Sequence, residues 1–576
     1  MTAVKAPCRP YQTAAVGVAI DRFSSGVPSG LVELPTGTGK TRLSAEVIGW
    51  TLAAGKRALF IAHRNTLVKQ GAREIGRFLG RQVGVWCGEE QASLHAPVLS
   101  ASKDSLTPKN LSRLDAAEFG VLVCDECHHA TNSNTSYRRV FDWAAEAGVP
   151  RLGITATPDR SDGVTLVGEG KPFAELFYRY PMWDPDGGPS AISDGWLVPV
   201  RQDHLHVDGL DFSAIKKKKN WTDEDIEAVL AKEQTQLELA SSTVDHCEGR
   251  PTVVFCPTVA FAYKMSELID RYAGRPVSVV IHGQHKQHPI TKDDRRNRDR
   301  MFQEGERQFA ISVDALAEGW DAPRASCVAV MRPVKSRLRF AQMVGRGTRL
   351  SLGLPNEQVL AMTAAERRAA IAASAKPDCL VLGFYSNLAD LKLWVNAADV
   401  IGAGLPEEVR RRANKLKSGD TTQRLLKAKE QVEAEQAFAS WEAEETRRLN
   451  AERLQMFTPK AMVRRTSVDV YGEDRSRYEA DHTQEVEAFR FRTSKAVSRD
   501  QRPSVNQARF AVALGLSPEH CIGMTRKQVG GFISKAKAAG TQPDWARLKP
   551  AQMKFSLGWY FTDQGRERHD TERTSA

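Results

Sequence analysis

The sequence lacks the features that would place it in a membrane or outside the cell. No apolar run reaches the roughly 20 residues that a membrane-spanning helix requires. The opening residues, MTAVKAPCRPYQ, lack the apolar core of a signal peptide. The 9 cysteines are scattered and do not show the paired spacing of a disulfide framework. We therefore expect a cytoplasmic protein with no membrane contact.

Acidic residues are the minority among the charged ones. The chain has 70 Asp and Glu against 81 Lys and Arg, which leaves a net charge of +11. This balance suits a partner rich in phosphate groups, although net charge carries little information about specificity. The 576 residues allow several domains, and 41% hydrophobic residues are enough for full-sized cores.

Residues 34–41, with the sequence LPTGTGKT, have the pattern of a phosphate-binding loop. An apolar pair before them is typical of a strand end, and a helical stretch follows. The generic loop has a glycine where this chain has Leu34. Backbone N–H groups of such a loop approach phosphates, the lysine reaches the β- and γ-phosphates, and the last hydroxyl binds Mg²⁺. The expected nucleotide ligands are Pro35, Thr36, Gly37, Thr38, Gly39, Lys40 and Thr41.

Gln12 lies upstream of this loop, just ahead of an apolar helical stretch. A carboxamide both donates and accepts hydrogen bonds, so Gln12 could bind the edge of an adenine. A surface glutamine is the alternative interpretation.

Two adjacent carboxylates follow an expected buried strand over residues 120–124. We expect Asp125 to hold Mg²⁺ and Glu126 to orient and deprotonate the attacking water. The segment from Cys124 to His128 also has the spacing of a covalent haem site, but no export signal accompanies it. A zinc site would need a second ligand pair, and none is evident.

Further polar residues follow other expected strands. Arg64 and Lys103 come after strands at 57–62 and 97–102, where they could bind a phosphate backbone or be ordinary loop residues. Strands that alternate with helices predict a parallel sheet with its site at the carboxyl ends. A second α/β pattern begins at residue 252.

Two clusters have competing interpretations. The four lysines at 216–219 fit a solvated loop better than a nucleic-acid contact. His282, His285 and His288 have the spacing of metal ligands but lack a carboxylate or cysteine to complete a shell.

The strings PTGTGKT, DECHH and GITATP, in this order, resemble the motifs of superfamily 2 nucleic-acid helicases of the DEAH/DExH kind. The continuation PDRSDG, at 158–163, is similar to the XPB-like and restriction-subunit-like branch of phages and bacteria. The strings ALAEGWDAP, at 315–323, and QMVGRGTR, at 342–349, resemble the fifth and sixth motifs of the family. The resemblance covers about residues 9–385.

The resemblance implies an α/β fold with two RecA-like parallel-sheet lobes in tandem, ATP and Mg²⁺ as cofactors, and ATP hydrolysis stimulated by nucleic acid. Arg346 and Arg349 would stabilise charge on the transferred phosphoryl group. Gln342, Gly319 and Asp321 would contact the nucleotide or its water. Contact with nucleic acid, or coupling to it, would involve His128, Thr155, Thr157, Pro257, Arg332 and Ser336 in addition to the residues at the two strand ends.

Six regions are expected along the chain. They are a first lobe over 1–188, a connector over 189–245, a second lobe over 246–402, a charged helical and irregular region over 403–500, a small helical module over 501–541 and a tail over 542–576. In the module, Gly515 is a helix stop, and Thr525 with Gln528 predicts a capping box. This module could bind DNA or a partner protein, or pack on the motor.

The favoured interpretation is an ATP-dependent DNA helicase or translocase. Gln342, where DEAD-box RNA helicases usually have histidine, and Cys127-His128, in place of Ala-Asp, argue against the DEAD-box RNA branch. A motor subunit of a restriction or defence complex, an RNA helicase and a scaffold with a vestigial ATPase are alternatives. Intact Lys40, Asp125, Glu126 and Arg349 argue against the last of these.

Overall fold

The computed structural model describes residues 7–88, 90–91, 95–130, 134–156, 165–212, 215, 221–283, 285–313, 320–385, 395–415, 420–457, 510–516, 524–539 and 541. The chain falls into two compact units, residues 1–426 and 427–576. Within the described ranges, no helix combines the length and apolar character needed to cross a membrane.

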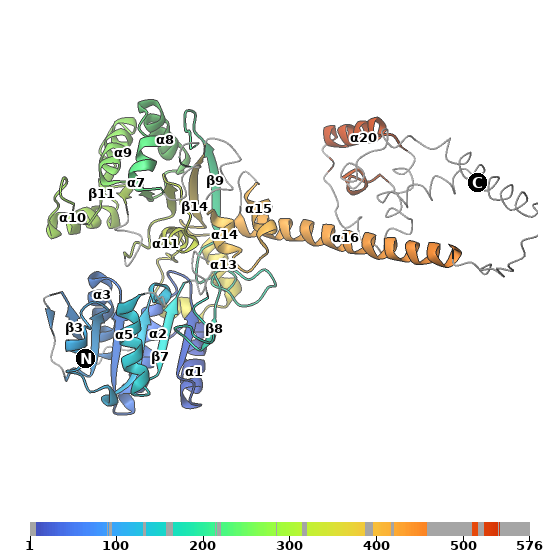
Figure 1. Ribbon diagram of the computed structural model, residues 1–576. Coiled ribbons are helices and arrows are strands. Elements are labelled where there is room, and N and C mark those ends of the chain that lie inside the picture. The colour runs from blue at the N-terminus through green and yellow to red at the C-terminus, as the bar shows by residue number, and fades with distance from the viewer. Residues whose placement is uncertain are drawn as a thin grey trace, which may run out of the picture. The chain divides into compact units, whose positions relative to one another are not determined.

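An eight-stranded sheet forms the first lobe (Figure 1). Its order is β4-β3-β5-β2-β6-β7-β1-β8, and all neighbouring strands are parallel except β3 and β4. The strands are β1 (Ser29–Glu33), β2 (Arg57–Ala62), β3 (Gly84–Cys87), β4 (Glu90–Gln91), β5 (Val98–Ser102), β6 (Phe119–Asp125), β7 (Arg151–Thr155) and β8 (Glu175–Arg179). Every residue of β1 and β5 is buried, as expected for a parallel sheet covered on both faces.

Helices cover this sheet (Figure 1). They are α1 (Pro10–Ser24), α2 (Lys40–Ala53), α3 (Asn65–Leu79), α4 (Pro108–Leu111) and α5 (Thr135–Glu146). Helix α3 ends at Gly80, whose φ of 64° lies in the left-handed region that glycine adopts without strain. This connectivity brings the carboxyl ends of β1, β2 and β6 to one edge of the sheet, where the expected site residues lie.

The second lobe is a six-stranded parallel sheet of order β11-β12-β10-β13-β14-β9. Its strands are β9 (Val200–His206), β10 (Thr252–Phe255), β11 (Ser278–Val280), β12 (Phe309–Ser312), β13 (Cys327–Val330) and β14 (Cys379–Tyr385). Its helices are α7 (Asp223–Val229), α8 (Glu233–His246), α9 (Val259–Tyr272), α10 (Lys292–Gln303), α11 (Arg337–Gly347), α12 (Asn356–Ala361), α13 (Ala364–Ala372), α14 (Ala397–Ile401) and α15 (Glu407–Asn414). Residues of α8 and α9 form one core with the strands. Two RecA-like α/β lobes in tandem are therefore present.

Strand β9 begins the second lobe earlier than residue 246, the boundary expected from sequence. It pairs with β14 over seven residues, from Val200 opposite Cys379 to His206 opposite Tyr385 (Figure 1). The expected connector thus contributes an edge strand and helices α7 and α8. The sequence obscured this strand because VRQDHLH is polar, and only two of its residues, Val200 and Gln202, are buried, as an edge strand allows.

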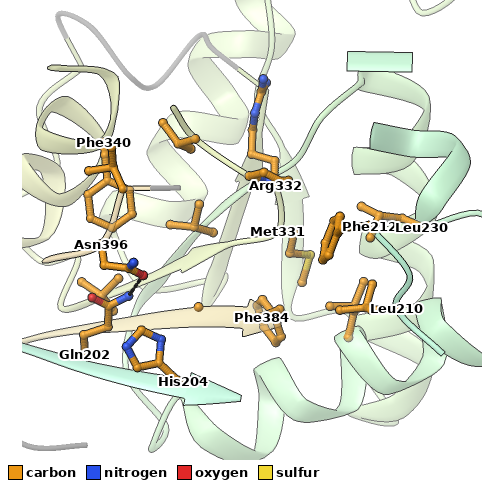
Figure 2. A pocket seen from close by; sticks show the side chains of 17 residues that line it. Gln202, His204, Leu210, Phe212, Leu230, Met331, Arg332, Phe340, Phe384 and Asn396 are labelled. Atoms are coloured by element: carbon orange, nitrogen blue, oxygen red, sulfur yellow. Dashed lines mark hydrogen bonds between the residues drawn. The ribbon is translucent and has the colours of Figure 1, made fainter. Parts of the chain in front are cut away.

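A small cavity of about 30 Å³ lies beneath β9 and β14 (Figure 2). Buried Gln202 donates to the Asn396 side chain at 3.3 Å and accepts from the backbone N–H of Ala397 at 2.6 Å, which fastens β9 to the start of α14. His204 borders the same cavity. Burial, with a smaller effect of the Arg424 charge, lowers the pKa of His204 to about 4.

In the second unit, α16 (Thr421–Phe457) continues from the first, and α20 (Arg526–Ala538) lies further along the chain. The expected capping box is present, because the Gln528 side chain accepts from the Thr525 backbone at 2.8 Å and the Thr525 hydroxyl accepts from the Gln528 backbone at 3.4 Å. Gly515, the expected helix stop, has a φ of 108°. The irregular segment expected at 460–500 and the tail from 542 lie outside the described residues.

The low pKa of His204 predicts a pH-dependent stability. In the unfolded chain this imidazole takes up a proton near pH 6.5, whereas the folded protein resists protonation until about pH 4. The free energy of unfolding should therefore fall as pH is lowered through this window, by at most about 1.4 kcal/mol per pH unit. Urea unfolding at several pH values should show a shallower dependence for His204→Gln. The control, His246→Gln, alters an exposed histidine and should leave the slope unchanged.

Candidate active site

The phosphate-binding loop joins the end of β1 to the start of α2. Gly37 and Gly39 have φ values of 89° and 81°, so both positions require the conformational freedom of glycine. Gly39 is also the N-cap of α2, which directs the amino end of that helix at the loop. Leu34 stands where the generic loop has glycine, and its side chain is fully buried. Its backbone N–H donates to the Thr155 carbonyl at 2.9 Å, so this position continues the sheet and needs no left-handed residue.

The expected carboxylates lie directly against this loop. Lys40 Nζ donates to Glu126 Oε1 at 2.7 Å, and both side chains are almost buried. Glu126 has a φ of 46°, a left-handed conformation that is strained for a residue with a side chain. His128 Nδ1 lies 3.4 Å from Glu126 Oε2 and 3.2 Å from the Thr155 hydroxyl. The loop lysine, the second carboxylate, His128 and the last residue of β7 therefore form one connected group.

Asp125 is the better candidate for a cation ligand. Burial raises the pKa of its carboxyl group, the Glu126 charge raises it further, and the Lys40 charge opposes both effects. A divalent cation would relieve this cost, because it favours the ionised carboxylate. Hard oxygen donors, such as this carboxylate and the Thr41 hydroxyl, suit Mg²⁺.

The second lobe reaches the loop through α11. A Cβ atom on Gly345 would lie only 2.6 Å from Thr36 Cβ, so the bare backbone of this helix packs against the loop. The Arg349 side chain is in close contact with Gly37. The following turn is fixed by the backbone N–H of Val198, which donates to the Thr348 carbonyl at 2.9 Å.

The structure distinguishes the two candidate arginines. Arg349 lies beside Gly37 and forms an ion pair with Asp321, and its burial lowers its pKa to about 10. Arg346 is buried and donates to the carbonyl oxygen of Trp320. Of the pair, Arg349 is thus the arginine in contact with the loop, whereas Arg346 fixes the backbone next to Asp321. Gln342 is buried one turn earlier in α11.

A pocket of about 270 Å³ adjoins the loop glycines. Gln12 lines it, donating through Nε2 to the Thr38 carbonyl at 2.8 Å and accepting from the Arg9 backbone at 3.0 Å. Apolar side chains of the second lobe form its opposite wall, namely Leu350, Leu352, Leu354, Val359 and Leu360. A pocket with an apolar wall and the carboxamides of Gln12 and Asn356, beside a phosphate-binding loop, has the character of a nucleobase site.

Two residues of this region were not singled out from sequence. Tyr11 donates its hydroxyl to the Thr38 carbonyl at 2.6 Å, so it holds the same loop atom as Gln12. Trp196 lines the pocket, with the Arg9 guanidinium 4.8 Å and the Arg367 guanidinium 3.9 Å from its ring centre. In the sequence, only the adjacency of Tyr11 to Gln12 could have indicated a role for Tyr11. Nothing local indicated Trp196, because it reaches the pocket by a long-range contact.

A groove of about 1290 Å³ runs between the amino-terminal part of α3 and α10. It is lined by seven basic side chains, Arg64, Lys69, Arg73, Arg81, Lys292, Arg295 and Arg296, and by three acidic ones, Glu90, Asp104 and Asp299. This excess of positive charge, contributed by both lobes, suits a polyanion.

The other residues expected to contact nucleic acid lie in different surroundings. Arg64 is exposed in this groove, whereas Lys103 pairs with Asp104 at 2.6 Å. Arg332 is buried and forms a two-pronged ion pair with Asp223 of α7, so it fastens that helix to the sheet. Pro257 is buried, and Ser336 is the N-cap of α11. Thr157, Gly319 and the lysines at 216–219 lie outside the described residues.

The metal interpretations gain no support from the side-chain arrangement. Within the described ranges, no group of three or more His, Cys, Asp or Glu side chains could hold a metal ion. His282 instead bonds with the Tyr263 hydroxyl at 3.1 Å, and the rings of His285 and His288 stack. Cys124 and Cys127 are fully buried, and burial raises the pKa of both thiols, which leaves them protonated.

Two protein families match this chain. Residues 5–160 match the family described as "Type III restriction enzyme, res subunit", and residues 234–351 match "Helicase conserved C-terminal domain". The chain is thus similar to a restriction-enzyme res subunit over its first lobe and to helicases over most of its second. Both matched segments carry motif residues described above, the loop and carboxylates in one and Gln342 to Arg349 in the other.

Curated relatives include bacterial and archaeal proteins. This chain is 25% identical to the type I restriction enzyme EcoAI endonuclease subunit of Escherichia coli, over 59% of this chain and 44% of that protein. It is 24% identical to the DNA 3'-5' translocase XPB2 of Sulfurisphaera tokodaii, over 55% of this chain and 74% of that protein. The matches cover 62%, 44% and 49% of the lengths of three curated relatives, of which the EcoAI subunit is the second. The chain therefore spans about half the length of these relatives.

Among solved structures, the helicase domain of Hef from Pyrococcus furiosus is 15% identical, with a TM-score of 0.42 over 67% of this chain and 97% of that one.

The contact between α11 and the loop predicts a large effect of one methyl group. Gly345→Ala would force Cβ atoms to within 2.6 Å across the two lobes. We expect the free energy of unfolding to fall by about 1–3 kcal/mol, as for an overpacked core. Gly17→Ala, in α1 with open space around it, should instead stabilise by about 0.5–1 kcal/mol, since alanine favours helix. Thermal and urea unfolding measure both effects, and an unaltered Gly345→Ala protein would contradict the observed packing.

Proposed function

We propose that this chain is an ATP-driven DNA motor that hydrolyses Mg·ATP between its two lobes and uses the cycle to move along DNA. One observation carries the proposal. The second lobe packs its helix α11 on the phosphate-binding loop of the first, with Arg349 against Gly37 and the carboxylates on the same loop. All charged groups required for phosphoryl transfer thus converge at one place.

Each residue has a defined part in the proposed hydrolysis. The backbone from Gly37 to Gly39 and the Lys40 ammonium bind the phosphates. Glu126, which Lys40 and His128 hold from two sides, orients the attacking water and accepts its proton. Mg²⁺ would be held by Thr41 and Asp125 and would neutralise phosphate charge. Arg349 stabilises the charge that develops on the transferred phosphoryl oxygens, a contribution of on the order of 10³–10⁵ in rate for such arginines.

The adenine is proposed to occupy the pocket beside Gln12. For this to happen, the carboxamide exchanges a contact with its own loop for the edge of the base. The apolar wall from the second lobe then covers the base, so nucleotide binding and contact between the lobes favour each other.

The basic groove is the proposed path of the nucleic acid. Its charges come from α3 in one lobe and α10 in the other, so a change in the contact between the lobes would displace one set of phosphate contacts relative to the other. Contacts to phosphates carry no sequence information, which suits a motor that moves over any sequence. DNA is favoured over RNA by the similarity to proteins named as a DNA translocase and restriction subunits.

A second candidate is the motor subunit of a restriction or defence complex. The match of residues 5–160 to the type III restriction family favours it. In this case the same motor would act within an assembly whose other chains recognise or cut the DNA.

ATP hydrolysis with matched single-stranded DNA, duplex DNA and RNA tests the proposal. We expect DNA to stimulate hydrolysis, Lys40→Ala to abolish it, and Arg349→Ala to lower kcat by at least about 10³ with ATP still bound. Lys56→Ala is the control, because this lysine is exposed and its ammonium donates to the Ala117 carbonyl at 2.8 Å.

If Lys40→Ala retains DNA-stimulated hydrolysis, the proposal is wrong. Stronger stimulation by RNA would make the nucleic acid RNA. Hydrolysis that requires a second chain would favour the subunit of a complex over a self-contained motor.

The groove predicts a salt-dependent affinity. Arg73→Ala removes one exposed cation of α3 that lines the groove. If Arg73 contacts a phosphate, log Kd measured against log salt should lose about 0.7 from its slope for a single strand. Arg77→Ala changes an exposed arginine of the same helix outside the groove and should leave the slope unchanged. Equal slopes for the unaltered protein, Arg73→Ala and Arg77→Ala would show that Arg73 does not contact the nucleic acid.

A further inference from the structure

Three histidine rings stack between the basic groove and the catalytic carboxylate. The ring of His129 lies between those of His63 and His128, with centroid separations of 3.9 Å and 4.2 Å. The first pair is tilted by 38° and the second by 47°. The rings come from two segments far apart in sequence, the end of β2 and the turn that follows β6.

The two ends of this stack touch different functional regions. His63 lines the groove next to Arg64, the exposed arginine that begins α3. At the other end, His128 lies 3.4 Å from Glu126 and 3.2 Å from the Thr155 hydroxyl. The stack is therefore a continuous path of side-chain contacts from the proposed phosphate-binding surface to the proposed catalytic base.

The backbone at Glu126 makes its carboxylate sensitive to this stack. Glu126 is held in a left-handed conformation with a φ of 46°, and a single turn from Cys127 to His129 follows it. A strained residue persists only where its surroundings fix it, and here those surroundings include the rings of the same turn. A displacement of His129 would thus move the backbone that sets the direction of the carboxylate.

We propose that His129 is a positioning residue that couples nucleic-acid binding to ATP hydrolysis. A strand in the groove shifts His63 and Arg64, and the packed His129 ring passes the shift to His128 and Glu126. The inference rests on the proposed function and adds to it the residue that makes hydrolysis depend on the strand. Couplings between two sites commonly change an affinity or rate about 5–150-fold.

The test uses the full chain and compares hydrolysis with and without a single-stranded DNA oligonucleotide. We expect His129→Ala to lower the ratio of stimulated to basal kcat by at least about fivefold. Its KM for ATP and its DNA affinity without nucleotide should stay within about twofold of the values for the unaltered protein, a range smaller than a typical coupling between sites. His129→Phe keeps a ring of similar shape and should retain most of the stimulation. His246→Ala, in an exposed part of α8, is the control.

A double-mutant cycle adds a second measurement. If the rings act in series, His63→Ala combined with His129→Ala should lose no more stimulation than the more defective single variant. Additive losses would mean that the two histidines act separately.

Three results would overturn the proposal. They are a normal stimulation ratio in His129→Ala, equal losses of basal and stimulated rates, which indicate a merely structural role, and a His129→Phe variant as defective as His129→Ala. A protein without any DNA stimulation before substitution would instead contradict the proposed function.

Discussion

Packing of α11 against the phosphate-binding loop is the contact on which the rest of the site depends. It requires glycine at position 345, because a Cβ atom there would lie only 2.6 Å from Thr36 Cβ. That approach places Arg349 beside Gly37 and the residues after it at the pocket next to Gln12. A bulky residue at position 345 would separate the two lobes. It would thereby move Arg349 away from the phosphate-binding loop.

The parts of the site that the sequence predicted are those set by local order. A phosphate-binding loop needs a strand, a glycine-rich turn and a helix in succession, and all three are contiguous between Leu31 and Trp50. The two carboxylates at the end of β6 and the capping box at Thr525 are likewise local. Which strand ends meet also followed from the alternation of strands and helices, because parallel strands deliver their carboxyl ends to one edge.

Features that depend on distant partners were not predictable from one sequence. Arg346 and Arg349 differ in position because one bonds with the Trp320 carbonyl and the other pairs with Asp321. Arg332 can be buried because it pairs with Asp223, more than a hundred residues away by number. Strand β9 was missed because an edge strand tolerates polar residues. The apolar wall of the pocket beside Gln12 comes from residues 350–360, whose leucines have the pattern of an ordinary short helix and loop.

The ion pair between Arg349 and Asp321 has a further consequence for energetics. A nearly buried guanidinium without an anion would be costly, and burial alone already lowers its pKa. Asp321 supplies that anion while the arginine lies against the loop. Under the proposed function, binding of a phosphate then exchanges one oxyanion for another around a cation that stays largely desolvated. Such an exchange has a small reorganisation energy, since neither the water shell nor the charge of the arginine has to be rebuilt during the reaction.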